Sequence, residues 1–181
     1  MRPGGDPFGN LAAAFLDLWP PDGKVEGPSE TAFRNAETQA TLRTSPKGFL
    51  DLLNQSAIDH KRPLLLLVDQ FEEIFRFRRR GSENSDGGDK QSIYQERNDS
   101  TAFVNMLLTS AEVAACEGRP LYVVITMRSD FIGDCEVFPE LPLAVSNSQF
   151  LVPRMTRRQL QEVIEKPLIA FHSEAQPDLV N

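Results

Sequence analysis

The chain has 181 residues, of which 19 are Lys or Arg and 26 are Asp or Glu, so its formal net charge is −7. A dedicated nucleic-acid binder needs a basic surface, and this acidic balance argues against one. Hydrophobic residues make up 40% of the sequence and charged residues 25%, which is typical of a folded globular protein with a sizeable core.

Membrane and secreted proteins are also disfavoured by the sequence. The longest apolar run, Leu64–Val68, is far shorter than the roughly 18 residues that span a bilayer. Prolines and glycines interrupt residues 2–7, where a signal peptide needs a basic segment followed by an apolar one. The two cysteines, Cys116 and Cys135, provide neither a disulfide framework nor a metal cluster. We therefore expect a soluble cytoplasmic chain without a membrane or nucleic-acid partner.

The first 60 residues predict three helices, of which two are introduced by a proline. Asp6 is a favourable cap and Pro7 a favourable first residue for a helix that ends at the double proline 20–21. A short polar helix is expected at 29–42. Ser45 and Pro46 then begin a third helix, with an apolar side made of Phe49, Leu52, Leu53 and Ala57.

Two uninterrupted apolar runs predict strands. Leu64–Val68 ends at Asp69, and residues 121–127 end at Arg128. Because these runs do not alternate with polar residues, we expect both strands to be buried on both faces. A shorter third strand is expected at 149–152, where Pro153 ends it. Helical stretches separate the strands, which predicts parallel pairing and the α/β class, as a three-layer sandwich with helices on both faces of the sheet.

The stretches between and after these strands are predicted as follows. Residues 70–79 continue the first strand as a helix, and residues 80–98 are polar and look like a mobile surface insertion. Asp99 or Ser100 starts a longer helix that ends near Gly118. A last amphipathic helix is capped by Thr156 and halted by Pro167.

Polar residues occupy the ends of the two predicted strands. In an open parallel sheet, ligands bind beyond the carboxyl ends of the strands, and the tips of neighbouring strands lie about 5 Å apart. Asp69 can hold a hard cation there, and Arg128 can form paired hydrogen bonds with phosphate oxygens. This combination is the minimum for a magnesium–nucleotide site.

Each of these residues also has a simpler interpretation. Asp69 could cap the next helix, and Arg128 could pair with Asp130 or another acid. Glu72 and Glu73 follow Asp69 at i+3 and i+4, so on a helix they come round to nearly the same side. One of them could polarise an attacking water, although acids in a first helical turn are favoured by the helix dipole alone.

Several of these segments resemble the novel STAND group of P-loop ATPases, whose members are often fused to WD-repeat propellers or other partner domains. Residues 64–73 resemble the Walker B segment, and residues 126–131 resemble the next strand end, which carries a sensor arginine. The stretch from Cys135 to Pro167 agrees as well, and residues 2–7 match the segment after the family's second strand. The resemblance covers most of the chain in the right order.

The resemblance implies specific roles for the residues at the strand ends. Asp69 would hold Mg²⁺, directly or through water, and Arg128 would contact the γ-phosphate of ATP. Glu72 or Glu73 would be the acid near the attacking water, because Gln70 occupies the position where many relatives carry that acid. The implied fold is an incomplete ASCE or AAA-like core.

The same resemblance predicts that residues 1–181 form one partial NTPase domain. Its stretches are a helical region (1–60), the Walker B strand and helix (61–80), the polar insertion (81–98), the sensor strand and the strand after it (99–155), and the C-terminal helix and tail (156–181).

One essential motif of the family is absent from the sequence. A P-loop ATPase needs G-x-x-x-x-G-K-[ST], whose amides and lysine hold the phosphates, and no such segment occurs in residues 1–181. The family places this loop before the residues that match Arg2–Pro7, so we expect a fragment that begins after it. We also expect ATP to bind weakly or not at all, and exposed apolar sheet edges to promote self-association.

Three functions are compatible with these features. The first is an NTPase module that switches an attached partner domain. The second is a non-enzymatic α/β remnant that acts through protein–protein contact. The third, a metal-dependent nuclease built on Asp69, Glu72 and Glu73, is disfavoured because no Lys or His is well placed on a neighbouring strand. The acidic net charge would also repel a phosphodiester backbone.

Overall fold

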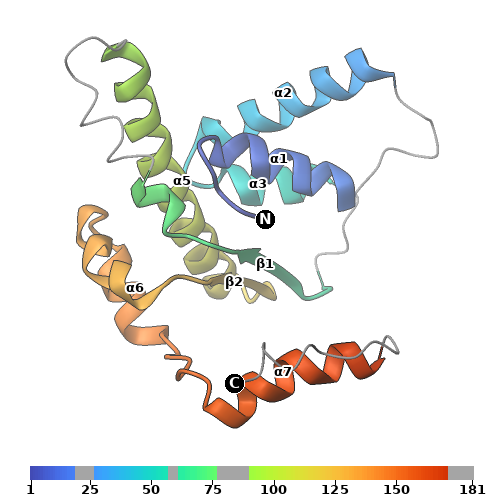
Figure 1. Cartoon of the computed structure of the whole chain (residues 1–181). Coiled ribbons are helices and arrows are strands. Elements are labelled where there is room, and N and C mark those ends of the chain that lie inside the picture. The colour runs from blue at the N-terminus through green and yellow to red at the C-terminus, as the bar shows by residue number, and fades with distance from the viewer. Residues whose placement is uncertain (19–26, 57–60, 77–89, 171–181) are drawn as a thin grey trace. The chain divides into compact units, whose positions relative to one another are not determined.

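The computed structural model describes residues 1–18, 27–56, 61–76 and 90–170, and the chain divides into two units, Met1–Ser148 and Gln149–Asn181. The elements of the first unit are α1 (Pro7–Leu18), α2 (Pro28–Thr44), α3 (Gly48–Gln55), β1 (Leu64–Val68), α5 (Lys90–Cys116), β2 (Leu121–Ile125), the 3₁₀-helix η1 (Ser129–Val137) and α6 (Leu141–Ser148) (Figure 1). The second unit contains α7 (Arg157–Ala170).

Helix α1 begins where the sequence predicts. The Asp6 carboxylate accepts a hydrogen bond from the backbone N–H of Gly9 at 3.0 Å, which satisfies an amide of the first helical turn. Pro7 occupies the first helical position, where its missing N–H costs nothing. The predicted inner stripe is buried, at Phe8, Leu11, Ala12 and Phe15. Trp19, which continues this pattern, lies outside the described residues.

Helices α2 and α3 are joined by a tight turn that displaces the predicted start of α3. The backbone carbonyl of Ser45 accepts from Gly48 N at 2.9 Å, so the helix begins at Gly48 rather than at Pro46. A Cβ atom on residue 48 would lie against the backbone carbonyl oxygens of Thr41 and Leu42. Glycine at this position therefore permits the close approach of the start of α3 to the end of α2.

Strands β1 and β2 form a parallel two-stranded sheet, as predicted. The register pairs Leu64 with Leu121 and Val68 with Ile125, so both strands start and end together. The described chain is thus mixed α/β, mostly helical, with a small parallel sheet. Helix α5 connects the two strands and packs on β2, which is the crossover arrangement that parallel strands require.

Only one face of this sheet is covered, which corrects the prediction that both strands are buried on both faces. Leu66 and Val68 of β1 and Leu121 of β2 belong to the hydrophobic core. The opposite face carries Leu65, Leu67, Tyr122 and Val124, whose exposed fractions are 61, 43, 59 and 43%. Because Leu65 pairs with Tyr122 and Leu67 with Val124, these four side chains are adjacent. We call them the open sheet face.

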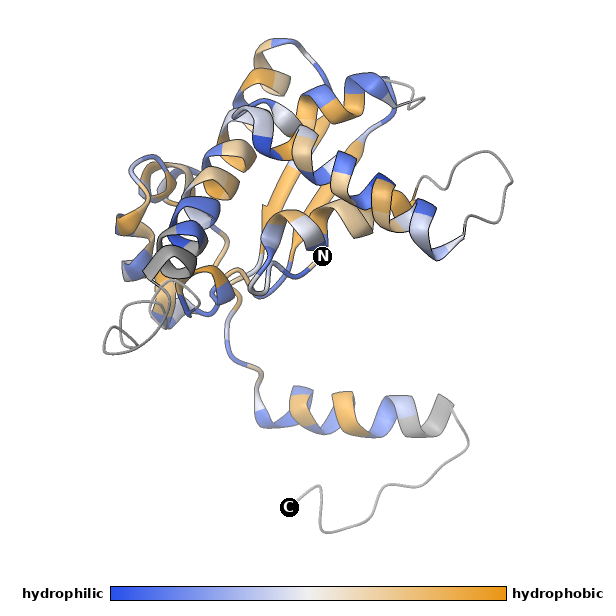
Figure 2. Ribbon diagram, turned by 90° about the horizontal axis from the view of Figure 1, so that it is seen from above, coloured by the Kyte–Doolittle hydropathy of each residue, from blue (hydrophilic) through white to orange (hydrophobic). Residues whose placement is uncertain are grey.

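The apolar runs explain why the prediction failed. Figure 2 shows that both strands are largely hydrophobic, and their sequences, LLLLV and LYVVI, carry no charged residue on either side. Such a run indicates that both faces are compatible with burial, but burial itself depends on a second layer. In the part of the chain that the structure describes, the covering helices lie on one face alone.

Helix α5 is longer than predicted. It begins at Lys90, whereas the sequence indicated Asp99 or Ser100, so the second half of the expected insertion is helical. Its first turns carry no apolar stripe, and a polar helix end gives no periodic signal. The predicted end is confirmed, because Gly118 follows with a φ of +66°.

The region after β2 contains three further differences. Residues 149–152 form no strand and are exposed, so the predicted third strand is wrong. An extended segment becomes a strand only when a neighbour pairs with its backbone, and no neighbour does so among the described residues. Helix α6 was not predicted. Helix α7 has the predicted Thr156 cap, but it continues through Pro167 to Ala170 instead of stopping there.

Arg43 links three helices of the first unit. Its guanidinium contacts Asp6 before α1 at 3.2 Å and Asp99 of α5 at 3.1 Å. It also lies 4.7 Å from the centre of the Phe8 ring. One cation on α2 therefore fixes the positions of α1 and α5, through charge and through a cation–π contact.

We expect Arg43→Ala to lower the free energy of unfolding by about 1–2 kcal/mol, since two partly screened ion pairs and one cation–π contact are lost. Urea unfolding followed by circular dichroism measures the change. Lys47→Ala, which removes a cation from an exposed position nearby, is the control and should change stability by less than about 0.5 kcal/mol. Equal effects of the two variants would contradict the linking role of Arg43.

Leu65 and Leu66 provide a matched test of the two sheet faces. Leu66→Ala should destabilise the protein by about 2–4 kcal/mol, because it empties a core position. Leu65→Thr combined with Tyr122→Thr should leave stability nearly unchanged and reduce self-association, because it makes the open sheet face polar. Denaturant unfolding and sedimentation velocity measure the two effects. A loss of stability in the threonine variant, measured at a concentration where the wild type is monomeric, would contradict the exposure of this face.

Candidate functional site

The carboxyl ends of β1 and β2 lie next to each other, and their pairing continues one step beyond the strands. Thr126 N donates to Val68 O at 3.0 Å, and Phe71 N donates to Thr126 O at 2.9 Å. Between these bonds, Gln70 adopts a φ of +55°, a left-handed conformation that is uncommon for a residue other than glycine. The chain thus turns sharply immediately after Asp69.

Asp69 is held at this edge by two side chains. The Thr126 hydroxyl donates to Oδ1 at 2.6 Å, and Arg2 Nε lies 3.3 Å from Oδ2. Both contacts favour the ionised carboxylate, and the pKa of Asp69 is accordingly below its usual value, chiefly because of the Thr126 hydrogen bond. The Asp69 side chain remains 43% exposed and therefore accessible to a ligand.

Arg2 reaches Asp69 because the first residue lies along the outer edge of β1. The Met1 nitrogen donates to Leu67 O at 2.8 Å, and Met1 O accepts from Asp69 N at 2.9 Å. This is the hydrogen-bond pattern of one residue of a parallel strand opposite Val68. Arg2 follows directly and is thereby placed beside the end of β1.

The two glutamates after Asp69 occupy different environments. Glu73 accepts a hydrogen bond from Gly4 N at 3.0 Å. Gly4 has a φ of +55°, so this turn suits glycine. Glu72 is only 6% exposed, and its Oε2 has no hydrogen-bond partner among the described residues. The i+3 and i+4 spacing does not place both carboxylates in one environment.

Arg128 lies at the same edge of the sheet and forms the pair that the simpler interpretation predicted. Its Nε and Nη2 donate to the two carboxylate oxygens of Asp130 at 3.1 and 2.7 Å. Both side chains are more than half exposed, at 60 and 56%. The guanidinium also lies 5.7 Å from the centre of the Phe131 ring.

A cluster of four phenylalanine rings lies in the segments that follow the two strands. Phe75 packs against Phe71, Phe131 and Phe138, with ring centroids 5.8, 6.2 and 5.8 Å apart. Phe71 and Phe75 follow Asp69 in the chain, and Phe131 and Phe138 follow Arg128. The cluster therefore joins the segment after β1 to the segment after β2 and fixes the two polar ends relative to each other.

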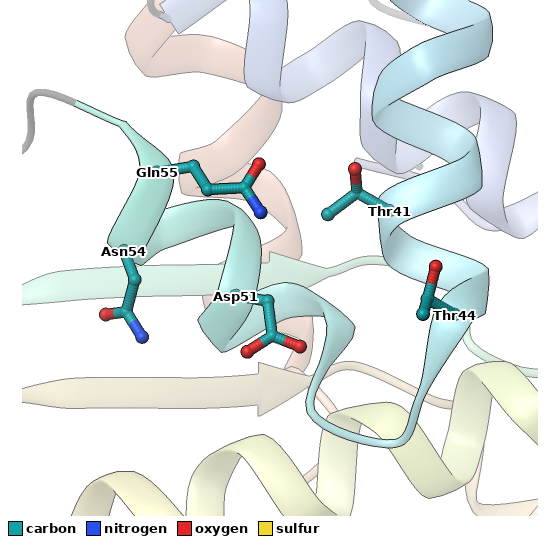
Figure 3. Close-up of a pocket in the computed structure, with 5 residues that line it drawn as sticks. All are labelled: Thr41, Thr44, Asp51, Asn54 and Gln55. Carbon is teal, nitrogen blue, oxygen red and sulfur yellow. The ribbon is translucent and has the colours of Figure 1, made fainter.

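A separate pocket of about 350 Å³ lies between α2 and α3, lined by Thr41, Thr44, Asp51, Asn54 and Gln55 (Figure 3). The Thr41 and Thr44 hydroxyls donate to carbonyls of their own helix, at 3.2 and 2.8 Å. Asn54 accepts from Arg119, which precedes β2, so this pocket borders the amino end of that strand. It is distinct from the edge that carries Asp69 and Arg128.

Sequence reasoning missed two residues of this edge, Arg2 and Thr126. Arg2 was assigned to a loop that starts a helix, and no local pattern indicates a contact 67 positions away. Thr126 was counted inside the second strand, which the structure ends at Ile125. If two parallel strands end together, the residue after the second strand lies opposite Asp69. This alignment is the signal that could have identified Thr126.

A known protein family matches the whole length of the chain. The model of the novel STAND NTPase 1 family matches residues 1–181. The chain belongs to the novel STAND NTPase 1 family. No curated protein and no solved structure gives a match. No described helix is long and apolar enough to cross a membrane.

The residues at the strand ends of this STAND family member have the donor chemistry that Mg²⁺ prefers. Asp69 supplies a carboxylate, and the Thr126 hydroxyl lies 2.6 Å from it. No group of three or more acidic, His or Cys side chains in the described segments could hold a metal by itself.

Thr126→Val should raise the pKa of Asp69 towards its ordinary value, because the hydroxyl that stabilises the carboxylate is lost. In the wild type, the lowered pKa contributes stability above the unfolded value of about 3.9, and this contribution is lost as the pH falls through the folded value. The variant should therefore lose less stability on acidification. Carboxyl ¹³C NMR titration measures the pKa, with Thr44→Val as the control. An unchanged Asp69 pKa would contradict this hydrogen bond.

Proposed function

We propose that this chain provides the metal-holding and phosphate-sensing side of an ATP site in a STAND-type switch. The observation that carries the proposal is the position of Asp69 and Arg128. They follow two parallel strands in matched register, so an acid and a guanidinium lie at one edge of the sheet. Ligands of open α/β sheets bind at this edge.

The proposed roles follow from the chemistry of each group. Asp69 would hold Mg²⁺, which supplies charge neutralisation at the phosphates when bound. The Thr126 hydrogen bond keeps this carboxylate oriented and ionised. Arg128 would bind the γ-phosphate through the same pair of N–H groups that now contact Asp130. Phosphoryl transfer depends mainly on such positioning and electrostatics.

Of the two candidate acids near the attacking water, Glu73 is favoured by its surroundings. It is hydrogen-bonded to Gly4, two residues from the arginine that touches Asp69. Glu72 is nearly inaccessible to solvent. A residue that orients a water molecule must be within reach of it, so we assign this role to Glu73.

The sequence has no phosphate-binding loop, so residues 1–181 do not supply a cradle for the β- and γ-phosphates. We propose that these residues alone do not hydrolyse ATP. The output of the switch would pass to a protein partner or to a fused effector or repeat domain, as the family resemblance implies.

A second candidate function is that of a non-enzymatic α/β scaffold that acts through protein contact. The open sheet face favours it, because parallel sheets are normally covered on both sides. The two functions differ in what they require of Asp69. The nucleotide site needs its carboxylate, whereas a scaffold does not.

We expect isothermal titration calorimetry to show no saturable micromolar binding of Mg·ATP to the 181-residue chain, and phosphate-release assays to show no turnover. The physical reason is the missing cradle, which no other described group replaces. Asp69→Ala is the control variant and should then behave as the wild type does. Micromolar binding that Asp69→Ala abolishes would contradict the predicted inactivity and support a complete site.

A further inference from the structure

Both groups that the proposed site requires are already engaged with charged side chains of the same chain. Asp69 contacts Arg2, and Arg128 contacts Asp130. In each pair, the partner carries the charge of the ligand that the group would bind. Arg2 is a cation at the group proposed for a metal, and Asp130 is an anion at the group proposed for a phosphate.

The geometry of the first pair places Arg2 in direct competition with a cation. Thr126 donates to one carboxylate oxygen of Asp69 at 2.6 Å, and Arg2 Nε lies 3.3 Å from the other. A divalent cation that approaches the second oxygen meets a positive charge at that place. Two like charges at such separations repel each other even in water.

The geometry of the second pair is that of a bound oxyanion. Asp130 accepts two hydrogen bonds, from Nε and Nη2 of Arg128, at 3.1 and 2.7 Å. Arginine binds carboxylates and phosphates through this same pair of donors. A phosphate oxygen can therefore reach these donors only when Asp130 leaves them.

Both pairs are weak enough to be displaced. The side chains of Arg2 and Asp69 are 62 and 43% exposed, and those of Arg128 and Asp130 are 60 and 56% exposed. Ion pairs with such exposure contribute little, because water and salt screen them. Met1 nevertheless anchors the backbone beside Arg2 to β1, so the displaced guanidinium stays near the site.

We propose that Arg2 and Asp130 are internal substitutes for the metal ion and the phosphate of the strand-end site. They neutralise Asp69 and Arg128 in the free protein and are displaced when the ligands bind. The inference rests on the proposed nucleotide site and adds two residues that set its affinity. Removal of either residue should therefore strengthen ligand binding, whereas loss of a merely structural contact would weaken it.

The first experiment measures Mn²⁺ binding to the full chain by electron paramagnetic resonance of the free ion. Arg2→Gln should raise the affinity about two- to fivefold, the range expected for loss of an exposed ion pair. Arg2→Lys retains the charge and should stay close to the wild type. Arg62→Gln removes a cation at the other end of β1 and controls for net charge. Asp69→Asn, alone and with Arg2→Gln, identifies the fraction of binding that depends on Asp69.

The outcomes separate the inference from the function on which it rests. Equal or weaker Asp69-dependent binding in Arg2→Gln would overturn the role of Arg2 and leave the metal-holding role of Asp69 intact. Mn²⁺ binding that is insensitive to Asp69→Asn in both backgrounds, or absent from both, would count against the proposed site itself.

The second experiment uses pyrophosphate as the probe for the other pair. Calorimetry should show about two- to fivefold tighter binding to Asp130→Asn than to the wild type, and Arg128→Gln should abolish this gain. Glu136→Gln, in the same 3₁₀-helix, controls for the change in net charge. A gain that survives Arg128→Gln, or no gain at all, would overturn the role of Asp130.

Discussion

The parallel pairing of β1 with β2 is the constraint on which the rest of the molecule depends. Because Val68 pairs with Ile125, both strands end at the same level, and the next residues of each segment face one edge. The aromatic cluster around Phe75 then fixes the two segments that leave this edge. An antiparallel pairing of the same two strands would have separated Asp69 from Arg128 by the length of the sheet.

The sheet itself is only half covered. One face joins the core with α1, α3 and α5, while the open sheet face exposes four adjacent apolar side chains. Exposed contiguous apolar surface of this kind usually marks a contact with another chain or another domain. The described part of this STAND domain therefore combines a polar edge suited to ligands with an apolar face suited to packing.

Much of this arrangement could be predicted from local sequence signals. The Asp6–Pro7 helix start, both strand positions and the Thr156 cap depend on neighbouring residues, and the structure contains each of them. The parallel pairing followed from the helical stretch between the strands. The predicted third strand failed because 149–152 is apolar but has no described partner, and pairing is a non-local property.

The candidate site was predictable to a lesser degree. Asp69 and Arg128 were proposed because they end apolar runs. The simpler interpretation of Arg128, a pair with an acid such as Asp130, is the contact that the structure contains. The contacts of Arg2 and Gly4 with Asp69 and Glu73 span almost 70 residues, so no local pattern contains them. The burial of Glu72 could not be predicted either, because helical spacing indicates the side of the helix on which a side chain lies but not which residues pack against that side.

The two hydrogen bonds of Met1 also make the two outer sides of the sheet unequal. They occupy the last backbone groups on the outer side of β1, which shields the carboxyl end of that side from a foreign strand. No described strand lies against the outer side of β2. In the described sheet, the outer side of β2, the strand that leads to Arg128, therefore remains available to an additional strand from this polypeptide or another.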